Sequence, residues 1–415
     1  MLSRSDILKM ESIACGTPFY VVSRQQFESN FKDLTAAFSS RYQPFILAYS
    51  YKTNYLPYLC GIIKEKGGWA EVVSRLEYDL AVKIGHDPQK IIFNGPVKTA
   101  EDIVQAVEKG SIVNADSPSE LQLITDYAKA DPRRPVRVGL RINIALSDAA
   151  GQSHIQNALK TGRFGLDPAE FKSKLNIQDL KQLPNLQIVS LHGHTSTADR
   201  SRWCFEVITE TLCRLAEEFF PDSVEYLNIG GGFFGRMRPD MPFTDVPGFD
   251  DYAETICSVL GRNSWVRKKT PALVIEPGVA MAADAVRFIT KVVSVKSIRG
   301  DLFITVDGSA FHIKPTFHAL NLPHQVITRN ADPPIHTYSV VGATCMEKDI
   351  LLRNITASLP EPGDYICIDN VGAYTLVLTP PFITPAPAVL ADEDGCFKLV
   401  RRRQTLDDIF SSYVF

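Results

Sequence analysis

The sequence predicts an α/β fold, a (β/α)8 barrel of the TIM type, followed by an all-β domain built as a sandwich or small barrel. From about Phe45 to Glu276, short apolar runs alternate with segments of helical periodicity, as in βαβ units around a parallel sheet. After Glu276 the runs are β-rich, with no substantial helix between them. The expected domains are residues 1–28, an N-terminal strand segment that joins the β domain, residues 29–276, the barrel, and residues 277–415, the β domain.

Seven apolar runs in the first part are predicted strands that end in polar or glycine-rich turns: PFILAYS, KIIFNG, SIVNADS, VRVGLRIN, LQIVSLHGH, VEYLNIGGG and ALVIEPG. Helices are predicted between them at residues 77–84, 100–109, 119–128 and 205–219. Seven strands in this length, with an eighth easily hidden, favour a closed barrel over an open doubly wound sheet. The GxGxxG fingerprint of dinucleotide-binding folds is absent after the first strand, which counts against that alternative.

The β domain is predicted from five runs: VRFITKVVSVKSI, DLFITVDGS, HTYSVVGAT, DYICIDNVGAYTLVL and CFKLVRRR. An early strand at residues 17–23, TPFYVVS, is expected to join them. The proline-rich stretch at residues 379–390 is a predicted surface loop.

Composition narrows the classes of protein. The chain has 415 residues, is 45% hydrophobic and carries a formal net charge of −3, which gives no electrostatic case for nucleic acid. The basic triplet at residues 401–403 is expected to be a solvated face. No apolar stretch is long enough to cross a membrane, and residues 1–16 lack the apolar core of a signal peptide, so a cytoplasmic protein is expected. Eight cysteines form no CxxC pair and no histidine lies at zinc-ligand spacing beside them, so no metal site is expected.

Catalytic groups of such barrels come from the carboxyl ends of the strands. In chain order those ends carry Lys52, Ser74, Asn94, Arg141, His194, Gly230 to Gly232, and Glu276.

These residue types have a common chemistry. Desolvation disfavours the charged form of a lysine such as Lys52, which helps it form a Schiff base with an aldehyde. The NIGGG run exposes backbone N–H groups suited to a phosphate. Glu276 could keep a pyridine nitrogen protonated, and His194 could stack on a flat ring. Together they predict a pyridoxal phosphate site. Taken singly, Lys52 would be a surface lysine and GGG a flexible turn.

The motifs AYSYKTN, EVVSRLE, FNGPVKT, LHGHTST, NIGGGF, IEPG, GATC and VGAYT, in this order, resemble the fold-type III pyridoxal phosphate decarboxylases. That family includes diaminopimelate, ornithine, arginine and carboxynorspermidine decarboxylases, and the resemblance runs from about Thr17 to Leu378. It implies a decarboxylase that uses pyridoxal 5'-phosphate. Lys52 would hold the cofactor as an imine and His194 would stack on its ring.

The resemblance also implies the remaining cofactor contacts. Glu276 would bind the pyridinium nitrogen. Tyr374 would reach the phosphate or the substrate, and Arg141 and Glu71 would give polar support. The phosphate would be held by Thr197, Gly230, Gly231 and Gly232, with Gly278 of IEPG beside the cofactor. Cys345 falls at the position of a cysteine that, in the family, enters from a partner subunit and protonates the product carbon. A homodimer with shared active sites is therefore expected; by itself, Cys345 would be a buried apolar residue.

Four positions depart from the family pattern, all near the substrate end. Val279 replaces the arginine after EPG, Lys314 and His318 replace the Arg and Tyr of the Arg-Pro-x-x-Tyr stretch, and Met346 replaces an acid that recognises the substrate's far end. Glu347 stands one residue beyond that position. The run CMEKD resembles the Cys-x-x-x-Asp version found in decarboxylases of siderophore and antibiotic pathways, in which Asp349 would be the acid that remains at this site. Lys314, His312 and His318 either bind a carboxylate or are exposed strand residues.

The leading hypothesis is thus a decarboxylase of an amino acid or amino-acid conjugate in specialised metabolism. The alternatives are a diaminopimelate- or ornithine-type decarboxylase of primary metabolism, an alanine racemase, which the motif run fits poorly, a barrel enzyme without this cofactor, and a non-catalytic binding homologue. Retention of Lys52, Glu276 and Cys345 argues against the binding homologue. The stretch 147–161 is either a lid loop or an ordered surface turn.

Overall fold

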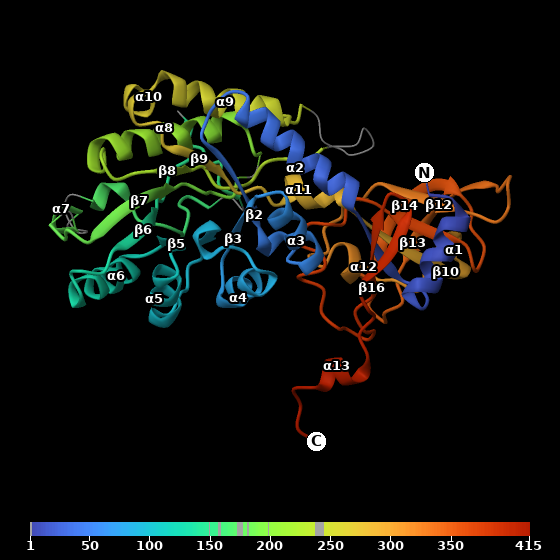
Figure 1. The fold of residues 1–415 in the computed structure, drawn as a ribbon. Coiled ribbons are helices and arrows are strands. Elements are labelled where there is room, and N and C mark those ends of the chain that lie inside the picture. Colours follow the sequence, from blue (N-terminus) through green and yellow to red (C-terminus); the bar gives the residue numbers. More distant parts are fainter. Residues whose placement is uncertain are drawn as a thin grey trace. The chain divides into compact units, whose positions relative to one another are not determined.

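A computed structural model describes residues 2–415, except 149, 157–158, 172–176, 181, 198 and 237–244. The described residues fall into two compact units (Figure 1). The barrel unit comprises residues 30–235 and 245–280, and the β unit comprises residues 2–29, 236 and 281–415. The helix α2 (Arg24–Ser39) contains the first boundary between them.

The barrel unit is built on a closed barrel of eight parallel strands in chain order, so the predicted fold class is confirmed. The strand that the sequence hid is the short β3, which is the second of the barrel. The strands are β2 (Phe45–Ser50), β3 (Trp69–Val72), β4 (Ile91–Phe93), β5 (Ile112–Ala115), β6 (Val136–Arg141), β7 (Leu186–His192), β8 (Tyr226–Asn228) and β9 (Ala272–Ile275).

Helices surround this barrel, and each predicted helix is present. Three begin one to three residues earlier than the periodicity indicated, because a capping residue or proline precedes the first apolar position. Ser74 caps one and Ser117 another, each accepting a hydrogen bond from the helix backbone. The helices are α3 (Pro57–Glu65), α4 (Arg75–Ile84), α5 (Ala100–Glu108), α6 (Pro118–Ala130), α7 (Ile177–Leu180), α8 (Arg202–Phe219), α9 (Phe249–Arg262) and α10 (Ser264–Lys269).

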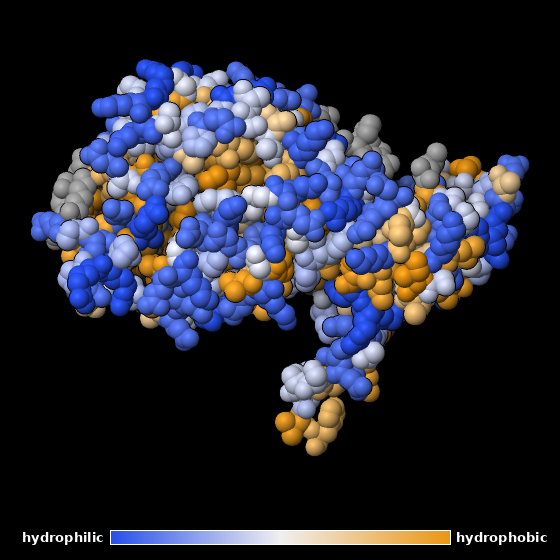
Figure 2. Space-filling view, viewed as in Figure 1, coloured by the Kyte–Doolittle hydropathy of each residue, from blue (hydrophilic) through white to orange (hydrophobic). Residues whose placement is uncertain are grey.

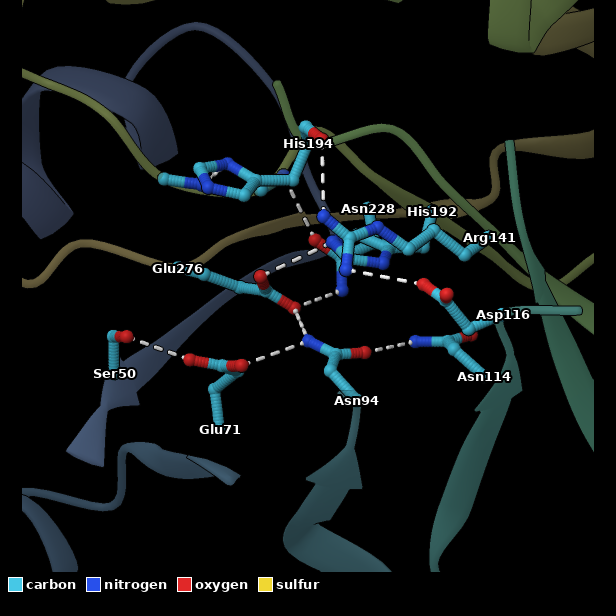
Figure 3. Close-up of polar contacts among 12 residues, drawn as sticks. Ser50, Glu71, Asn94, Asn114, Asp116, Arg141, His192, His194, Asn228 and Glu276 are labelled. Atoms are coloured by element: carbon cyan, nitrogen blue, oxygen red, sulfur yellow. Dashed lines mark hydrogen bonds and ion pairs between the residues drawn. The ribbon is translucent and has the colours of Figure 1, made fainter. Parts of the chain in front are cut away.

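The barrel lumen is divided into an apolar and a polar part. Near the amino ends of the strands, the buried side chains of Ala48, Ile92, Ile112 and Val274 pack together, with Trp69 and Tyr226 against them. Near the carboxyl ends the lumen side chains are polar (Figure 3). The apolar side chains fill the barrel toward the amino ends of its strands, so reactive groups can be accommodated only among the polar side chains at the carboxyl ends.

The β unit contains one nine-stranded mixed sheet. Its main order is β14-β13-β11-β10-β1-β16-β17, while β15 pairs with β10 and β12. The early strand β1 lies between β10, antiparallel, and β16, parallel. The strands are β1 (Phe19–Ser23), β10 (Val286–Ile298), β11 (Asp301–Val306), β12 (His324–Ile327), β13 (Ile335–Val341), β14 (Ile350–Ser358), β15 (Tyr365–Ile368), β16 (Ala388–Glu393) and β17 (Cys396–Arg401). Its helices are α1 (Arg4–Ala14), α12 (Ala310–Ile313) and α13 (Leu406–Phe410), while α11 (Val279–Ala282) contains the boundary between the two units at Met281.

Three details of the β unit differ from the sequence predictions. The run predicted as a strand over residues 364–378 is a strand only over Tyr365–Ile368, because the chain turns at Asn370, which has a positive φ of 64°. The proline-rich loop ends at Pro387, beyond which Ala388 begins β16 and pairs with β1. The sequence also gave no sign of β12 and β14.

The basic triplet is not simply a solvated face. Arg403 donates to the carbonyl oxygens of Gly16 (3.0 Å) and Pro18 (2.8 Å), and Arg401 donates to that of Pro387. The guanidinium groups thus tie the end of the chain to the sheet.

Beyond the triplet the chain projects from the β unit and ends in exposed apolar side chains, which appear as orange atoms on the tail in Figure 2. Within the described residues, no helix has the length and apolarity needed to cross a bilayer.

The capping box of α5 offers a test of local stability. Thr99 Oγ1 accepts from Asp102 N, and Asp102 Oδ2 accepts from Thr99 N at 2.9 Å. Thr99→Ala should lower the free energy of unfolding of the barrel unit by about 1 kcal/mol, measured by urea denaturation. Thr99→Ser, which keeps the oxygen, should lose much less. An equal loss in both variants would show that the threonine methyl group, not the cap, is responsible.

Candidate active site

A cluster of polar side chains lies in the barrel lumen at the carboxyl ends of the strands (Figure 3). At its centre is Glu276, which directly follows β9 and is 3% exposed. Its Oε1 accepts hydrogen bonds from Asn94 Nδ2 (2.8 Å) and Asn228 Nδ2 (2.6 Å). Its Oε2 lies 3.2 Å from Nε2 of His192. Side chains from the ends of three other strands therefore fix the orientation of one carboxylate.

Lys52 lies in the single helical turn Tyr51–Thr53 that follows β2. Its Nζ donates to Glu71 Oε2 at 2.8 Å and to Ser50 Oγ at 3.0 Å, and about a third of its side chain is exposed. Glu71 is buried and also accepts from Ser50 Oγ and, through Oε1, from Asn94 Nδ2 at 3.0 Å. Lys52 is therefore a half-buried, paired amine and not a solvated surface lysine.

The two carboxylates differ in their partners. Burial alone would raise the pKa of the Glu276 carboxyl, but the nearby His192, Lys52 and His194 together hold it well below its usual range. Glu276 is therefore ionised at neutral pH, with two amide donors on Oε1. The carboxylate of Glu71 is paired with the amine of Lys52. The lumen thus holds the ionised carboxylate of Glu276, and beside it the Lys52 amine paired with the carboxylate of Glu71.

His194 presents an uncharged flat ring. Burial, assisted by the charges of Lys52 and Arg141, lowers the pKa of His194 to about 3. Its Nδ1 accepts a hydrogen bond from the backbone N–H of Gly231 at 3.1 Å, as a neutral imidazole can. The ring is within 4° of parallel to that of His192, with centroids 6.4 Å apart.

The glycine turn packs against both of these side chains. Gly230 and Gly232 have φ of 74° and 98°, in the region that favours glycine. A Cβ on Gly231 would lie 2.3 Å from the carbonyl oxygen of Glu276, and one on Gly230 would lie 2.5 Å from Cβ of His194. Only a chain without side chains fits here. The N–H groups of Gly230 and Gly231 donate to Asn228 Oδ1 and His194 Nδ1, so the N–H that the described contacts leave for an anion is that of Gly232.

Arg141 supports the ring side of the site. Its guanidinium donates to Asp116 Oδ1 and to the carbonyl oxygen of His194, both at 3.2 Å. Thr197 is half-buried, and its backbone forms a bridge with Ile155. The predicted lid stretch 147–161 includes residues 149, 157 and 158, which lie outside the described residues.

Gly278 and Val279 complete the barrel-unit candidates. A Cβ on Gly278 would lie 1.9 Å from Thr53 Oγ1, so this position also requires glycine. Val279 begins α11 and brings no cation where the family pattern has arginine.

The remaining candidates belong to the β unit. Cys345 and Tyr374 are exposed, and Tyr374 has a positive φ of 55°. Met346 is half-buried, while His318 and Glu347 are exposed.

Asp349 is a structural acid in its own unit. It is 2% exposed, and its two oxygens accept four hydrogen bonds, from Ser309 Oγ, Ala310 N, Thr344 N and Thr344 Oγ1. A carboxylate with these partners is committed to the loop that carries GATC, and little of its capacity remains for a substrate cation.

Lys314 and His312 are not exposed strand residues, as one alternative had it. His312 lies in α12, Lys314 directly follows it, and both are buried. The one hydrogen bond described for Lys314 is a long one, 3.4 Å to the carbonyl oxygen of Leu320. Burial, together with the charge of Arg353, lowers the pKa of Lys314 to about 8.

Several residues of the cluster were missed in the sequence. Ser50, His192 and Asn228 each stand two positions before a predicted strand-end residue: Lys52, His194 and Gly230, respectively. Because side chains alternate along a strand, a residue two positions back faces the same lumen. Applying that rule at each strand end would have found all three. Asn114 and Asp116, at the end of β5, obey the same alternation.

Comparison with known proteins agrees with this geometry. Residues 24–283 match the family described as pyridoxal-dependent decarboxylase, pyridoxal binding domain. A probable chloroplastic diaminopimelate decarboxylase of Oryza sativa subsp. japonica is 29% identical over 94% of this chain and 78% of its own length. An L-glutamyl-[BtrI acyl-carrier protein] decarboxylase of Niallia circulans is 27% identical over 95% of this chain and 93% of its own length.

Solved structures are similar as well. The crystal structure of diaminopimelate decarboxylase from Methanocaldococcus jannaschii superposes with a TM-score of 0.86 and 26% identity, covering 98% of this chain and 94% of that one. The same protein has been solved in complex with L-lysine.

The glycine turn gives a direct test of the site. Gly231→Ala should weaken binding of pyridoxal phosphate about tenfold or more, because the new methyl group must push the turn away from the Glu276 carbonyl. Fluorescence titration of the cofactor would measure it. The matched control is Gly261→Ala in α9, where a Cβ meets nothing within 4 Å and should leave binding unchanged. Wild-type affinity in Gly231→Ala would show that the turn does not hold the phosphate.

Proposed function

Because this chain belongs to the pyridoxal-dependent decarboxylase family and is a pyridoxal phosphate-dependent amino-acid decarboxylase, we propose that its substrate is of the diaminopimelate type and that the polar lumen of the barrel carries the reaction. The observation that supports this most is the joining of Lys52, Glu71 and Glu276 through Asn94 in one hydrogen-bonded set.

The residues present fit the cofactor. Lys52 supplies an amine that can bind an aldehyde, and Glu276 supplies an ionised carboxylate for a ring nitrogen. The turn 230–232, where a Cβ on Gly230 or Gly231 would clash, offers a phosphate the N–H of Gly232, since those of Gly230 and Gly231 donate to Asn228 and His194. Val279 places no cation there, so in this proposal the phosphate depends on the backbone and on Thr197.

When bound, the cofactor supplies an electron sink for the pair left behind by carbon dioxide. Each residue of the lumen has its own part. Ser50 and Glu71 hold the Lys52 amine in place, and Glu71 can take a proton from its Nζ. Glu276, ionised at neutral pH, holds a proton at the ring nitrogen. His194, neutral, offers a flat face without adding positive charge.

The substrate proposal follows the relatives. Diaminopimelate decarboxylases from plants, bacteria and archaea match over 94–95% of this chain. One solved relative binds L-lysine, which is diaminopimelate without one carboxylate. These matches support the primary-metabolism alternative better than the hypothesis of specialised metabolism.

A second candidate is an amino-acid conjugate, as acted on by the acyl-carrier-protein relative. Two observations favour it: Met346 stands where the family has an acid, and Asp349 is used by its own loop. Lys314, whose one described hydrogen bond is long, is the group we propose for a substrate carboxylate in either case, with His318 as a further candidate. Glu347 is the acid that we propose for a substrate cation.

Replacing the amine tests the proposal as a whole. Lys52→Ala should lower carbon dioxide release from meso-diaminopimelate by more than about 100-fold, the scale on which loss of a proton-transferring group is felt. Borohydride reduction of the wild-type protein, followed by peptide mapping, should place the pyridoxyl group on Lys52. The control is Lys83→Ala in α4, a lysine on the barrel's outer helices, which should keep wild-type turnover.

Faster release from acyl-carrier-bound glutamate than from diaminopimelate would favour the second candidate. No release from any amino acid, despite a bound cofactor, would contradict the proposal.

We also propose a homodimer in which the exposed thiol of Cys345 serves the site of a second copy, returning a proton to the carbon that lost carbon dioxide. Coexpression of Lys52→Ala with Cys345→Ala should then restore activity toward about a quarter of wild type, since random pairing of two chains gives one intact site in half of the dimers. Mixing that restores nothing, with both chains folded, would contradict a shared site.

A further inference from the structure

His192 is a buried histidine without an ordinary role. It is the last residue of β7, its side chain is 1% exposed, and neither ring nitrogen has a hydrogen-bond partner among the described residues. Leaving a buried polar group unpaired costs about 1–3 kcal/mol. An apolar side chain would avoid that cost, so its presence calls for a function.

Its nearest polar neighbour is the oxygen of Glu276 that the amides leave open. Oε1 of Glu276 is filled by Asn94 and Asn228, whereas Oε2 has His192 Nε2 at 3.2 Å, without the angle of a hydrogen bond. Small movement of the ring or of the carboxylate would complete the bond.

The elements packed around His192 limit what else it can meet. Arg141 on β6 and Asn228 on β8 are its neighbours in register, and His194 follows on its own strand. Arg141 is engaged by Asp116 and by a carbonyl oxygen, and Asn228 by Glu276. Of the acceptors described beside His192, Glu276 Oε2 is the one within hydrogen-bonding distance of its ring.

We propose that His192 is a positioning residue that donates from Nε2 to Oε2 of Glu276, and so keeps this carboxylate ionised and aimed at the ring nitrogen of the cofactor. This rests on the proposed role of Glu276. Burial by itself would favour the protonated acid, which could not hold a proton on a pyridine nitrogen. The two amide donors already oppose that tendency, and the imidazole N–H would add to them once the bond to Oε2 is made.

The donor can be removed or kept by substitution. His192→Phe keeps a flat ring without a donor, and His192→Gln can place an amide N–H near the position of Nε2. His192→Asn has the same group on a shorter side chain that falls short of Oε2. The matched control is His86→Phe: His86 is also buried in the barrel unit, also has an unpaired Nε2, and makes no described contact with the Glu276 cluster.

The readouts are the visible band of the pyridoxal phosphate-loaded protein as a function of pH, the cofactor affinity, and kcat and KM. His192→Phe should shift the band's titration by about one pH unit, the equivalent of a tenfold change in proton affinity, and lower kcat about tenfold with little change in KM. His192→Gln should restore both, His192→Asn should not, and His86→Phe should match wild type.

Two results would overturn the inference: wild-type titration and kcat in His192→Phe, or equal behaviour of the Gln and Asn variants. The Gln and Asn pair decides the matter if the Phe variant does not fold. A wild-type protein that binds no cofactor or releases no carbon dioxide would instead overturn the proposed function, so the two failures are distinct.

Discussion

The structure depends on one constraint, that two carboxylates must share the narrow lumen of a barrel. Glu71 and Glu276 are both almost fully buried, and like charges in such a place repel strongly. The side-chain amide of Asn94 lies between them and donates to both, at 3.0 and 2.8 Å. Each acid then has its own neighbour: the Lys52 amine donates to Glu71, and His192 Nε2, the donor that we propose for Glu276, lies 3.2 Å from its Oε2. That amide therefore separates the carboxylate paired with Lys52 from the carboxylate beside His192.

The barrel could be predicted from the sequence because seven of its eight strands are apolar runs followed by a polar or glycine-rich end, whereas β3 is four residues long and contains Glu71. Of the candidate site, the sequence indicated Lys52, Asn94, His194, Glu276 and the glycine turn, which come after strands, together with Arg141, and the family resemblance added Glu71. The partners that were missed, Ser50, His192 and Asn228, lie inside strands, where a lone Asn or His resembles a satisfied core residue. These residues could have been found from the alternation of side chains along a strand, but that rule can be applied only once the end of each strand is known.

The β unit was harder to predict, for a different physical reason. Its strands pair across long sequence separations, as β1 does with β10 and β16, so no local pattern states the partner or the register. Strand β14 is broken in its pattern by polar residues on the exposed face, and β12 is only four residues long. Substrate choice is harder still to predict, because the sequence does not show whether a charged side chain is already paired. Asp349 accepts four hydrogen bonds within its own unit, whereas the one hydrogen bond described for Lys314 is long.

The amide chain of the lumen has a direction. Asn114 donates to Asn94, which donates to the two acids, and ionised carboxylates only accept. Gly139 leaves the space that this requires, since a Cβ there would lie 1.8 Å from Asn114 Oδ1. No amide can flip without leaving an oxygen against an oxygen, so the set has a single orientation. The side-chain amide dipoles of Asn114 and Asn94 are therefore oriented when the chain folds. Little reorganisation of these dipoles is then needed when charge changes in the lumen during a reaction.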